Sequence, residues 1–242
     1  MHPELLSWGP INVHTWGVMI AIAFMVVNYL VTRTITQSKL MTPDDVLEGG
    51  IVAIFSGVLG ARMAFIIEYR SLFKNDLREI FMIQHGGLVF YGGLILGLIS
   101  LAIWCRIRKF CLIKVLDATA PAMLIGIGIG RIGCFFNGCC YGRPTFLPWA
   151  VHFPDVPGLV HPTQLYEFIG TTVVGLLAYA LKPKLTGKGQ TLGLCLLLYG
   201  VERFLVEMVR VTPSYFGLTS AQWISIALVT SGTYLLCFIR RN

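Results

Sequence analysis

Long apolar stretches separated by short polar ones dominate this chain. Seven stretches are about the length that a helix needs to cross the hydrocarbon core of a bilayer, roughly 20 residues. They cover Thr15–Thr32, Val46–Ile67, Leu88–Trp104, Val115–Phe136, Leu165–Leu181, Thr191–Val209 and Leu218–Ile239. No other stretch is long enough to build a separate soluble domain. The pattern predicts one all-α integral membrane domain over residues 1–242, with about seven transmembrane helices and short polar loops at 68–87 and 138–163.

The charge distribution predicts how such a domain would be oriented. Hydrophobic residues make up 55% of the chain and charged residues only 13%, which is typical of polytopic membrane proteins. Loops on the side of the C-terminus carry eleven Lys and Arg residues, and the opposite loops carry four. The positive-inside rule therefore predicts a cytoplasmic C-terminus, an external N-terminus and two outer loops at 68–87 and 138–163. Since topology accounts for the net charge of +7, we expect no nucleic-acid partner.

One apolar stretch contains a charge that needs an explanation. Residues 125–142 read IGIGIGRIGCFFNGCCYG and place Arg131 inside a predicted membrane helix. An arginine at such a depth costs at least a few kcal/mol, so it indicates a functional site. The segment also matches G-x-G-x-x-G, but no strand precedes it, which excludes a dinucleotide site. The glycines instead favour close packing between helices.

Further polar side chains fall at the same predicted depth, toward the outer ends of the helices. Arg203, Glu207 and Arg210 follow i, i+4, i+7 spacing and share one helical face. Several arginines in a partly dehydrated site would grip a phosphate, and the phosphate of a membrane belongs to a phospholipid. The residues thus predict a phospholipid-headgroup enzyme or binding protein. The set comprises Arg131, Arg203, Arg210, His85, Tyr91, Asn137, His161, Gln164, Tyr166, Glu167 and Glu207.

Two other classes of function compete with this interpretation. A thiol-redox or metal protein could use Cys134, Cys139 and Cys140 with His152 or His161. Adjacent cysteines are awkward co-ligands and no C-x-x-C pair is present, so we expect no metal and no cofactor. A transporter would place its buried charges near the midplane of the membrane, whereas these charges gather on one side.

Four motifs, in order along nearly the whole chain, resemble the prolipoprotein diacylglyceryl transferase family. They are His85-Gly-Gly with Phe90-Tyr-Gly-Gly93, Gly130-Arg-Ile-Gly133 through Asn137 and Gly142, His161-Pro-Thr-Gln-Leu-Tyr-Glu167, and Arg203-Phe-x-x-Glu207-x-x-Arg210. The resemblance implies a multi-pass enzyme of the bacterial inner membrane with its site toward the outer leaflet. The implied reaction moves the diacylglyceryl group of phosphatidylglycerol to the lipobox cysteine thiol of a prolipoprotein. A thioether forms and glycerol 1-phosphate leaves.

By position, the resemblance assigns roles to individual residues. Arg131 and Arg203 would bind the headgroup phosphate and stabilise charge on the leaving group, and Glu207 would orient Arg203. Tyr91 and His161 complete the expected catalytic set. The expected contacts to phosphatidylglycerol, besides Arg131, are Asn137, Gly142, His85, Gln164, Tyr166, Glu167 and Arg210. The partners implied are phosphatidylglycerol, membrane lipid and the signal-peptide segment that carries the lipobox.

The chain departs from the usual family pattern at four positions. Cys134 replaces a common Asn, Cys139 a common Glu, Tyr91 the usual histidine, and Trp16 a usual tyrosine of the first span. Tyrosine is a poor base near neutral pH, since its reference pKa is about 10. His85, His161, Glu167 and Glu207 are therefore all candidates for the base. A divergent member with another thiol acceptor, or without activity, is the alternative.

Overall fold

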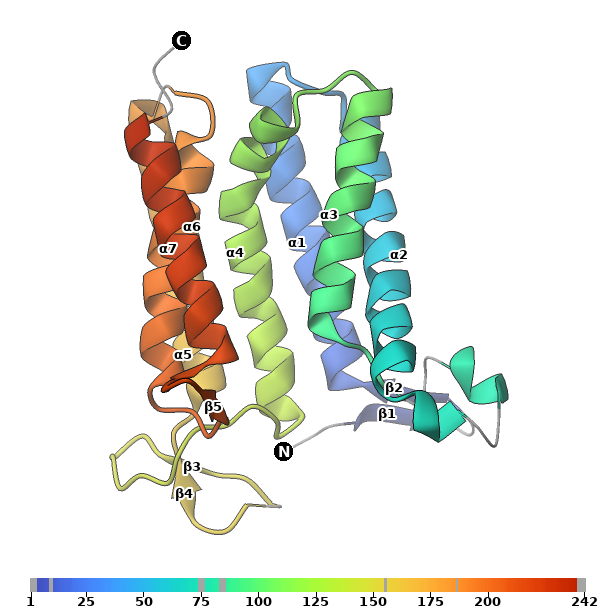
Figure 1. Cartoon of the computed structure of the whole chain (residues 1–242), viewed down its shortest axis with the longest axis vertical. Helices are drawn as coiled ribbons and strands as arrows, with labels where there is room; N and C mark the ends of the chain where they lie inside the picture. Colours follow the sequence, from blue (N-terminus) through green and yellow to red (C-terminus); the bar gives the residue numbers. More distant parts are fainter. Residues whose placement is uncertain are drawn as a thin grey trace. The chain divides into compact units, whose positions relative to one another are not determined.

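The computed structural model describes residues 4–8, 11–73, 77–82, 86–154, 156–185 and 187–238. In this part of the chain the helices are α1 (Thr15–Ser38), α2 (Pro43–Glu68), α3 (Phe90–Ile107), α4 (Leu112–Phe136), α5 (Thr163–Leu181), α6 (Gln190–Glu207) and α7 (Ser220–Phe238) (Figure 1). Each overlaps one predicted apolar stretch, and the count of seven membrane spans stays a prediction. The chain divides into two compact units, residues 1–34 with 116–242 (unit 1) and residues 35–115 (unit 2).

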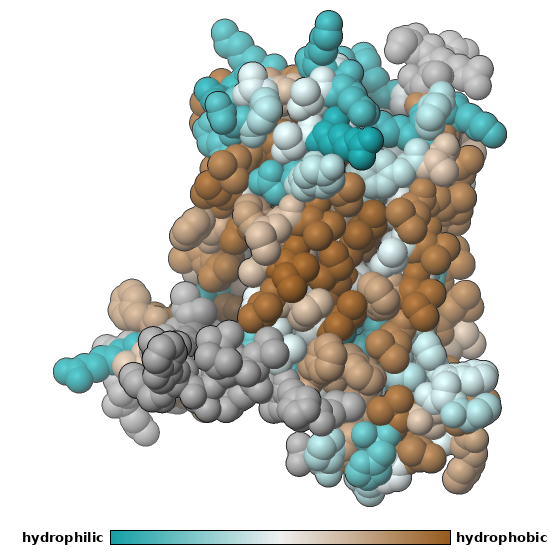
Figure 2. Space-filling model, turned by 180° about the vertical axis from the view of Figure 1, so that it is seen from behind, coloured by the Kyte–Doolittle hydropathy of each residue, from teal (hydrophilic) through white to brown (hydrophobic). Residues whose placement is uncertain are grey.

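Five of these helices, α1 to α5, are long and apolar enough to cross a membrane. Many large apolar side chains on them face outward, and Phe55 on α2 is 73% exposed. Figure 2 shows such apolar side chains over the middle of the helices and hydrophilic ones toward their ends. An outward-facing apolar surface of this kind suits lipid and not water. The integral membrane class thus agrees with the structure.

Small residues let the helices of unit 1 approach one another closely. A Cβ atom at Gly175 of α5 would lie 2.8 Å from the carbonyl oxygen of Pro121 on α4, and one at Gly200 of α6 would lie 2.9 Å from the Ser225 carbonyl oxygen on α7. Leu124, Ala178 and Cys195, from α4, α5 and α6, form a buried apolar cluster between these helices. Close contact of this kind holds membrane helices together, because lipid supplies no hydrophobic drive for their association.

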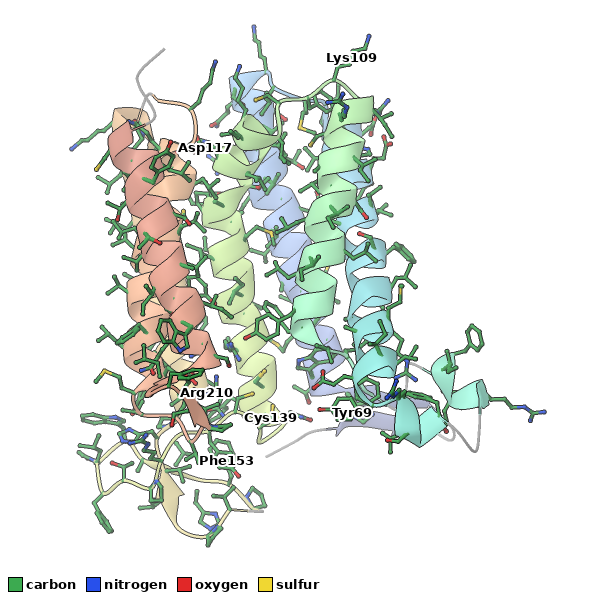
Figure 3. All side chains as sticks on the ribbon, viewed as in Figure 1. Tyr69, Lys109, Asp117, Cys139, Phe153 and Arg210 are labelled. Carbon is green, nitrogen blue, oxygen red and sulfur yellow. The ribbon has the colours of Figure 1, made fainter. Side chains whose placement is uncertain are left out.

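A hydrogen bond near one end of the helices also connects α4 with α6. The Asp117 carboxylate of α4 accepts a hydrogen bond of 2.8 Å from the backbone N–H of Leu192, in the first turn of α6. The first N–H groups of a helix have no partner within the helix, so Asp117 acts as its cap from a neighbouring helix. Figure 3 labels Asp117 near one end of the unit 1 helices, and Arg210 and Cys139 near the other.

Three short antiparallel hairpins accompany the helices of unit 1. They pair β1 (Glu4–Trp8) with β2 (Ile11–His14), β3 (Val151–His152) with β4 (Leu159–Val160), and β5 (Ser214–Tyr215) with β6 (Leu218–Thr219). The all-α prediction is right for the helices but omitted these hairpins. The strands β3 to β6 have two residues each and leave no alternating pattern that a sequence can reveal, and β1 and β2, of five and four residues, lie before the first predicted apolar stretch.

Unit 2 is built on the close crossing of α2 and α3. A Cβ at Gly93 would lie 2.8 Å from the Gly57 carbonyl oxygen, and Gly92 faces Gly60 more closely still. Gly92 and Gly93 therefore serve helix packing within α3. The other pair, Gly86 and Gly87, has positive φ values of 83° and 81°. The backbone is thus irregular at Gly86 and Gly87, whereas Gly92 and Gly93 lie within α3.

Arg62 of α2 holds the polar segment that follows α2. Its guanidinium donates hydrogen bonds to the carbonyl oxygens of Ile80 at 3.0 Å, Gly86 at 2.5 Å and Gly87 at 3.1 Å. The side chain is buried, and its charge is spread over several backbone acceptors. The segment itself contains two 3-10 turns, Arg70–Phe73 and Leu77–Ile80. Arg62 is thus occupied in fixing the fold of unit 2.

Candidate phosphate-binding site

Three arginines and two carboxylates meet within unit 1. Glu167 on α5 is the centre of the group: its carboxylate lies 2.6 Å from Arg131 Nε, 3.7 Å from Arg203 Nη1 and 3.6 Å from Arg210 Nη1. Glu207 lies 2.7 Å from Arg203 and 3.8 Å from Arg210. These five residues are called the arginine cluster below. The contacts bring together five of the residues that the sequence singled out.

The arginine cluster draws on three helices. Arg131 sits on α4, where a Cβ at the nearby Gly133 would lie 3.1 Å from the Met19 side chain of α1. Glu167 lies in the first turns of α5, and Arg203 and Glu207 are one turn apart at the end of α6. Arg203 and Glu207, which the i, i+4 spacing placed on one helical face, form an ion pair. A Cβ at Gly128 of α4 would lie 3.1 Å from the Phe168 carbonyl oxygen, so this glycine lets α4 approach α5, the helix that carries Glu167.

The cluster is charged, partly buried and incompletely hydrogen-bonded. Glu167 is 1% exposed, whereas the Arg131 side chain keeps 22% exposure. The Oε2 atoms of both carboxylates lack an aligned hydrogen-bond donor among the described residues, so charge and not hydrogen-bond geometry holds these pairs. Three guanidinium groups face two carboxylates, which leaves one net positive charge in the cluster. Such a site attracts a single anion.

Backbone contacts fasten the segment around Gly142 against the cluster. The Gly142 amide donates to the His161 carbonyl at 2.9 Å, and the Arg143 amide donates to the Val209 carbonyl at 2.7 Å. Gly142 also pairs with Arg210 as a β-bridge. These contacts place the start of α5 beside the end of α6. Since its amide is already bonded, Gly142 acts in this structure through close packing.

Replacing Gly142 with alanine should destabilise the protein by about 1–3 kcal/mol. The new Cβ would lie 2.6 Å from the Val209 carbonyl oxygen and 2.8 Å from both His161 Cβ and Thr163 Cγ2, so backbone must move. Thermal unfolding in detergent measures the loss. The Gly17→Ala variant is the matched control, because a Cβ there meets nothing within 4 Å. Equal unfolding temperatures for the two variants would contradict the packing role.

A second polar group surrounds the hydroxyl of Tyr166. Trp149 Nε1 donates to this oxygen at 2.7 Å, and His161 Nδ1 lies 3.2 Å from it. The rings of His161 and Tyr166 meet edge to face, with centroids 6.0 Å apart. The tyrosine therefore fixes the orientation of the histidine ring. Trp149 was not singled out from the sequence, because nothing local relates it to a residue 17 positions later.

The first residues of α5 hold the turn that carries Cys139 and Cys140, called the cysteine-containing turn below. Gln164 Nε2 donates to the Cys139 carbonyl at 2.6 Å, and Thr163 Oγ1 donates to the Cys140 carbonyl at 2.6 Å. Gln164 is 1% exposed, and its Oε1 atom has no hydrogen-bond partner among the described residues. One end of the Gln164 side chain is thus occupied by the turn. The Asn137 side chain is exposed and lies within hydrogen-bonding reach of the Cys139 thiol.

The thiol of Cys140 lies close to the arginine cluster. Its pKa is lowered because the thiols of Cys134 and Cys139 donate hydrogen bonds to its thiolate and because Arg210 and Arg131 carry positive charge nearby. All seven cysteines of the chain are free thiols. The cysteine-containing turn and the arginine cluster therefore form neighbouring parts of one polar region.

Two residues expected at the site belong to unit 2. Tyr91 lies in the first turn of α3, is 44% exposed, and packs its ring edge to face against Phe90 at 5.8 Å. His85 falls outside the described residues. Their roles stay predictions.

Two further polar residues join the site without having been predicted. Thr212 Oγ1 donates to the Glu207 carboxylate at 2.5 Å. Both carboxyl oxygens of Glu202 on α6 are buried without a hydrogen-bond partner among the described residues, and the side chain packs against Gly170 of α5. The sequence did carry a signal for Glu202, since it is an acidic residue directly before Arg203 in an apolar helix.

Comparison with known proteins decides the family. The family model described as prolipoprotein diacylglyceryl transferase matches residues 3–238. The chain belongs to the prolipoprotein diacylglyceryl transferase family. Its relatives include three proteins with the name phosphatidylglycerol–prolipoprotein diacylglyceryl transferase. That of Bordetella parapertussis is 36% identical over 99% of this chain and 95% of its own length. That of Finegoldia magna is 34% identical (93% and 90%), and that of Clostridium tetani 30% (97% and 96%).

The match to the prolipoprotein diacylglyceryl transferase family covers both units. It includes Tyr91 of unit 2 as well as the arginine cluster and the cysteine-containing turn of unit 1. The resemblance that the four motifs indicated is therefore confirmed at the level of the family.

Proposed function

We propose that this chain transfers the diacylglyceryl group of phosphatidylglycerol to the lipobox cysteine of a prolipoprotein. The observation that carries the proposal is the arginine cluster, a partly buried cationic site in a membrane protein of this family. Its three guanidinium groups can bind the phosphodiester of a lipid headgroup. The names of the relatives supply the two substrates, phosphatidylglycerol and a prolipoprotein.

Arg131 and Arg203 bind the headgroup phosphate in this proposal. Both guanidinium groups lie against Glu167 and can turn part of their N–H groups to a phosphate oxygen. As the bond between the glyceryl carbon and the phosphate oxygen breaks, negative charge grows on the leaving glycerol 1-phosphate. Guanidinium groups already in place stabilise that charge without further reorganisation. Glu207 orients Arg203, and Arg210 adds charge at the same oxygen of Glu167, Oε1, that Arg203 approaches.

The remaining groups serve the headgroup and the acceptor thiol. Asn137, Gln164, Tyr166 and Glu167 contact or position the glycerol moiety, with Gly142 setting the backbone. A thiol has a pKa near 8.5, so it needs a base or an electropositive site to become a good nucleophile. His161, held by Tyr166, is the candidate base within unit 1. Tyr91 and His85 are proposed to contribute from unit 2.

The same proposal includes the topology. All seven helices cross the inner membrane of a bacterium as one domain, with the N-terminus outside, the C-terminus in the cytoplasm, and the site toward the outer leaflet. The five long apolar helices and the excess of Lys and Arg on one side support this arrangement. A site at that depth meets both an outer-leaflet lipid and a secreted lipoprotein precursor.

Replacing Tyr166 with phenylalanine should lower transfer roughly 10-fold or more, because His161 loses the group that holds its ring. Stability should change by only about 1–2 kcal/mol, since the two hydrogen-bond contacts that are lost, to Trp149 and His161, are partly exposed. Transfer of labelled lipid to a lipobox peptide measures the first effect, and thermal unfolding the second. Tyr29→Phe, on an exposed tyrosine of α1, is the control. Unchanged transfer by Tyr166→Phe would remove His161 positioning from the mechanism.

Complementation tests the proposed function in the cell. The gene is expressed in a bacterium depleted of its own transferase, beside an Arg131→Ala variant produced at the same level. We expect growth with the wild-type chain and none with the variant. Absence of growth with well-expressed wild-type protein would contradict the proposal.

A further inference from the structure

The thiol of Cys134 on α4 and the two thiols of the cysteine-containing turn form a cluster that phosphate binding does not require. The Sγ atoms of Cys134, Cys139 and Cys140 all lie within 4.8 Å of one another, and each side chain is half-buried. Cys134 sits on α4, one turn after Arg131, and the other two follow the end of that helix. Three sulfur atoms at this spacing have the arrangement of a metal site.

The backbone explains how two adjacent cysteines can bind the same metal ion. Side chains of neighbouring residues in extended backbone point in opposite directions. Cys140 instead has a φ of 65°, in the left-handed region that residues other than glycine seldom adopt. This conformation turns the Cys140 thiol toward the side of Cys139. Strain of this kind persists only where the surroundings enforce it, and it concentrates at functional sites.

Hydrogen bonds to α5 supply that enforcement. Gln164 and Thr163 donate to the carbonyl oxygens of Cys139 and Cys140, and both donors are buried. Cys139 is also bonded back to α4, since its amide donates to the Cys134 carbonyl at 3.2 Å. The three sulfurs are therefore held by fixed backbone at every position. The awkwardness of adjacent cysteines, which the sequence suggested, is removed by this turn.

We propose that Cys134, Cys139 and Cys140 bind one Zn²⁺ ion as thiolates and leave its fourth position to the acceptor thiol. Zn–S bonds of about 2.3 Å in a tetrahedral site separate sulfur atoms by about 3.8 Å. The three Sγ atoms lie within 4.8 Å of one another, so side-chain rotations that bring them up to about 1 Å closer complete the site. Three protein ligands and one open position are the pattern of catalytic zinc. Thiolate ligands favour zinc over the hard cations magnesium and calcium.

The charge around the cluster suits such a site. Zn²⁺ with three thiolates carries one net negative charge, and Arg131 lies about one helical turn before Cys134 on α4. Arg210 and Cys139 are labelled at the same end of the unit 1 helices in Figure 3. The metal site would therefore lie beside the phosphate site, where the acceptor thiol must meet the lipid.

This inference rests on the proposed function for the role of the fourth ligand. On coordination the acceptor thiol gives its proton to His161, the base of the proposed function, and is held as a thiolate. Its sulfur electron pair then forms the C–S bond to the glyceryl carbon. The C–O bond to phosphate breaks, and its electron pair leaves on the oxygen of glycerol 1-phosphate. No oxidant or reductant is needed.

Metal titration tests the site without relying on activity. Reduced, metal-free protein in detergent is titrated with Zn²⁺, and separately with Co²⁺, whose absorption reports thiolate ligands. We expect about one ion per chain and a thiolate-to-cobalt absorption band. Single Cys139→Ser and Cys140→Ser variants should each weaken zinc binding at least about 10-fold. Cys111→Ser is the control, because that thiol is exposed and lies in unit 2.

The possible outcomes separate the metal site from the proposed function. A wild-type protein that binds no zinc, binds only copper(I), or is isolated with these thiols as a disulfide would overturn the site. Unchanged zinc binding in both serine variants would also overturn it. Zinc binding by a chain that transfers no lipid would contradict the proposed function and leave the site standing. A lipobox peptide should alter the cobalt spectrum, whereas a peptide with serine in place of its cysteine should not.

Discussion

The Arg131→Lys variant is expected to lose roughly 100- to 1,000-fold in diacylglyceryl transfer while remaining folded. Arg131 uses its Nε to approach Glu167 at 2.6 Å, and this leaves the terminal amino groups of the guanidinium for a phosphate oxygen. Lysine keeps the positive charge but has one nitrogen, so it cannot contact Glu167 and hold a phosphate in the same geometry. The loss therefore measures bidentate recognition separately from charge.

Purified wild-type and variant protein in vesicles of phosphatidylglycerol provide the comparison. Arg106→Lys is the control, since Arg106 is exposed at the end of α3. This variant should transfer lipid at the wild-type rate. Thermal unfolding of both variants separates lost chemistry from lost structure. Transfer by Arg131→Lys within about threefold of wild type would show that charge alone suffices at this position. It would contradict bidentate recognition of the phosphate by Arg131.

Replacing Glu167 with glutamine is expected to destabilise the protein by about 3–5 kcal/mol. Glu167 is buried and faces three guanidinium groups, so its loss leaves Glu207 as the one ion-pairing carboxylate of the arginine cluster. Glutamine has the same size and can still accept hydrogen bonds, so the change isolates the charge. The uncompensated buried cations account for the cost, which thermal or denaturant unfolding in detergent measures.

Glu48→Gln is the matched control for this substitution. Glu48 pairs with Arg108 at 2.7 Å, but both side chains are nearly half exposed. Solvent screens an exposed pair, which contributes at most about 1 kcal/mol. A destabilisation of Glu167→Gln no larger than that of Glu48→Gln would contradict the structural role of Glu167. High salt should weaken the Glu48 pair and change the Glu167 effect little.

The helices and the arginines could be predicted from the sequence because both leave local patterns. A run of about 20 apolar residues predicts a membrane helix wherever it occurs. The i, i+4 spacing of Arg203 and Glu207 predicted that they share one helical face, where the structure has an ion pair between them. Depth along the predicted helices also indicated that Arg131 and Glu167 fall at one level. Family motifs then connected these residues with one reaction.

Contacts between distant segments could not be predicted in this way. Which carboxylate lies at the centre of the arginine cluster depends on how α4, α5 and α6 cross, and glycine contacts between helices decide that. The bond from Trp149 to Tyr166 depends on the path of a loop. The cysteine cluster depends on one left-handed residue, Cys140, and no sequence pattern reveals a positive φ at a residue other than glycine.

Direct transfer in a purified system tests the central claim. Wild-type protein is placed in phosphatidylglycerol vesicles with a peptide that carries a lipobox cysteine, and the peptide is analysed by mass spectrometry. We predict a mass increase of one diacylglyceryl group on the cysteine sulfur, with release of an equal amount of glycerol 1-phosphate. An unmodified peptide, in the presence of folded wild-type protein and both substrates, would contradict the proposed function.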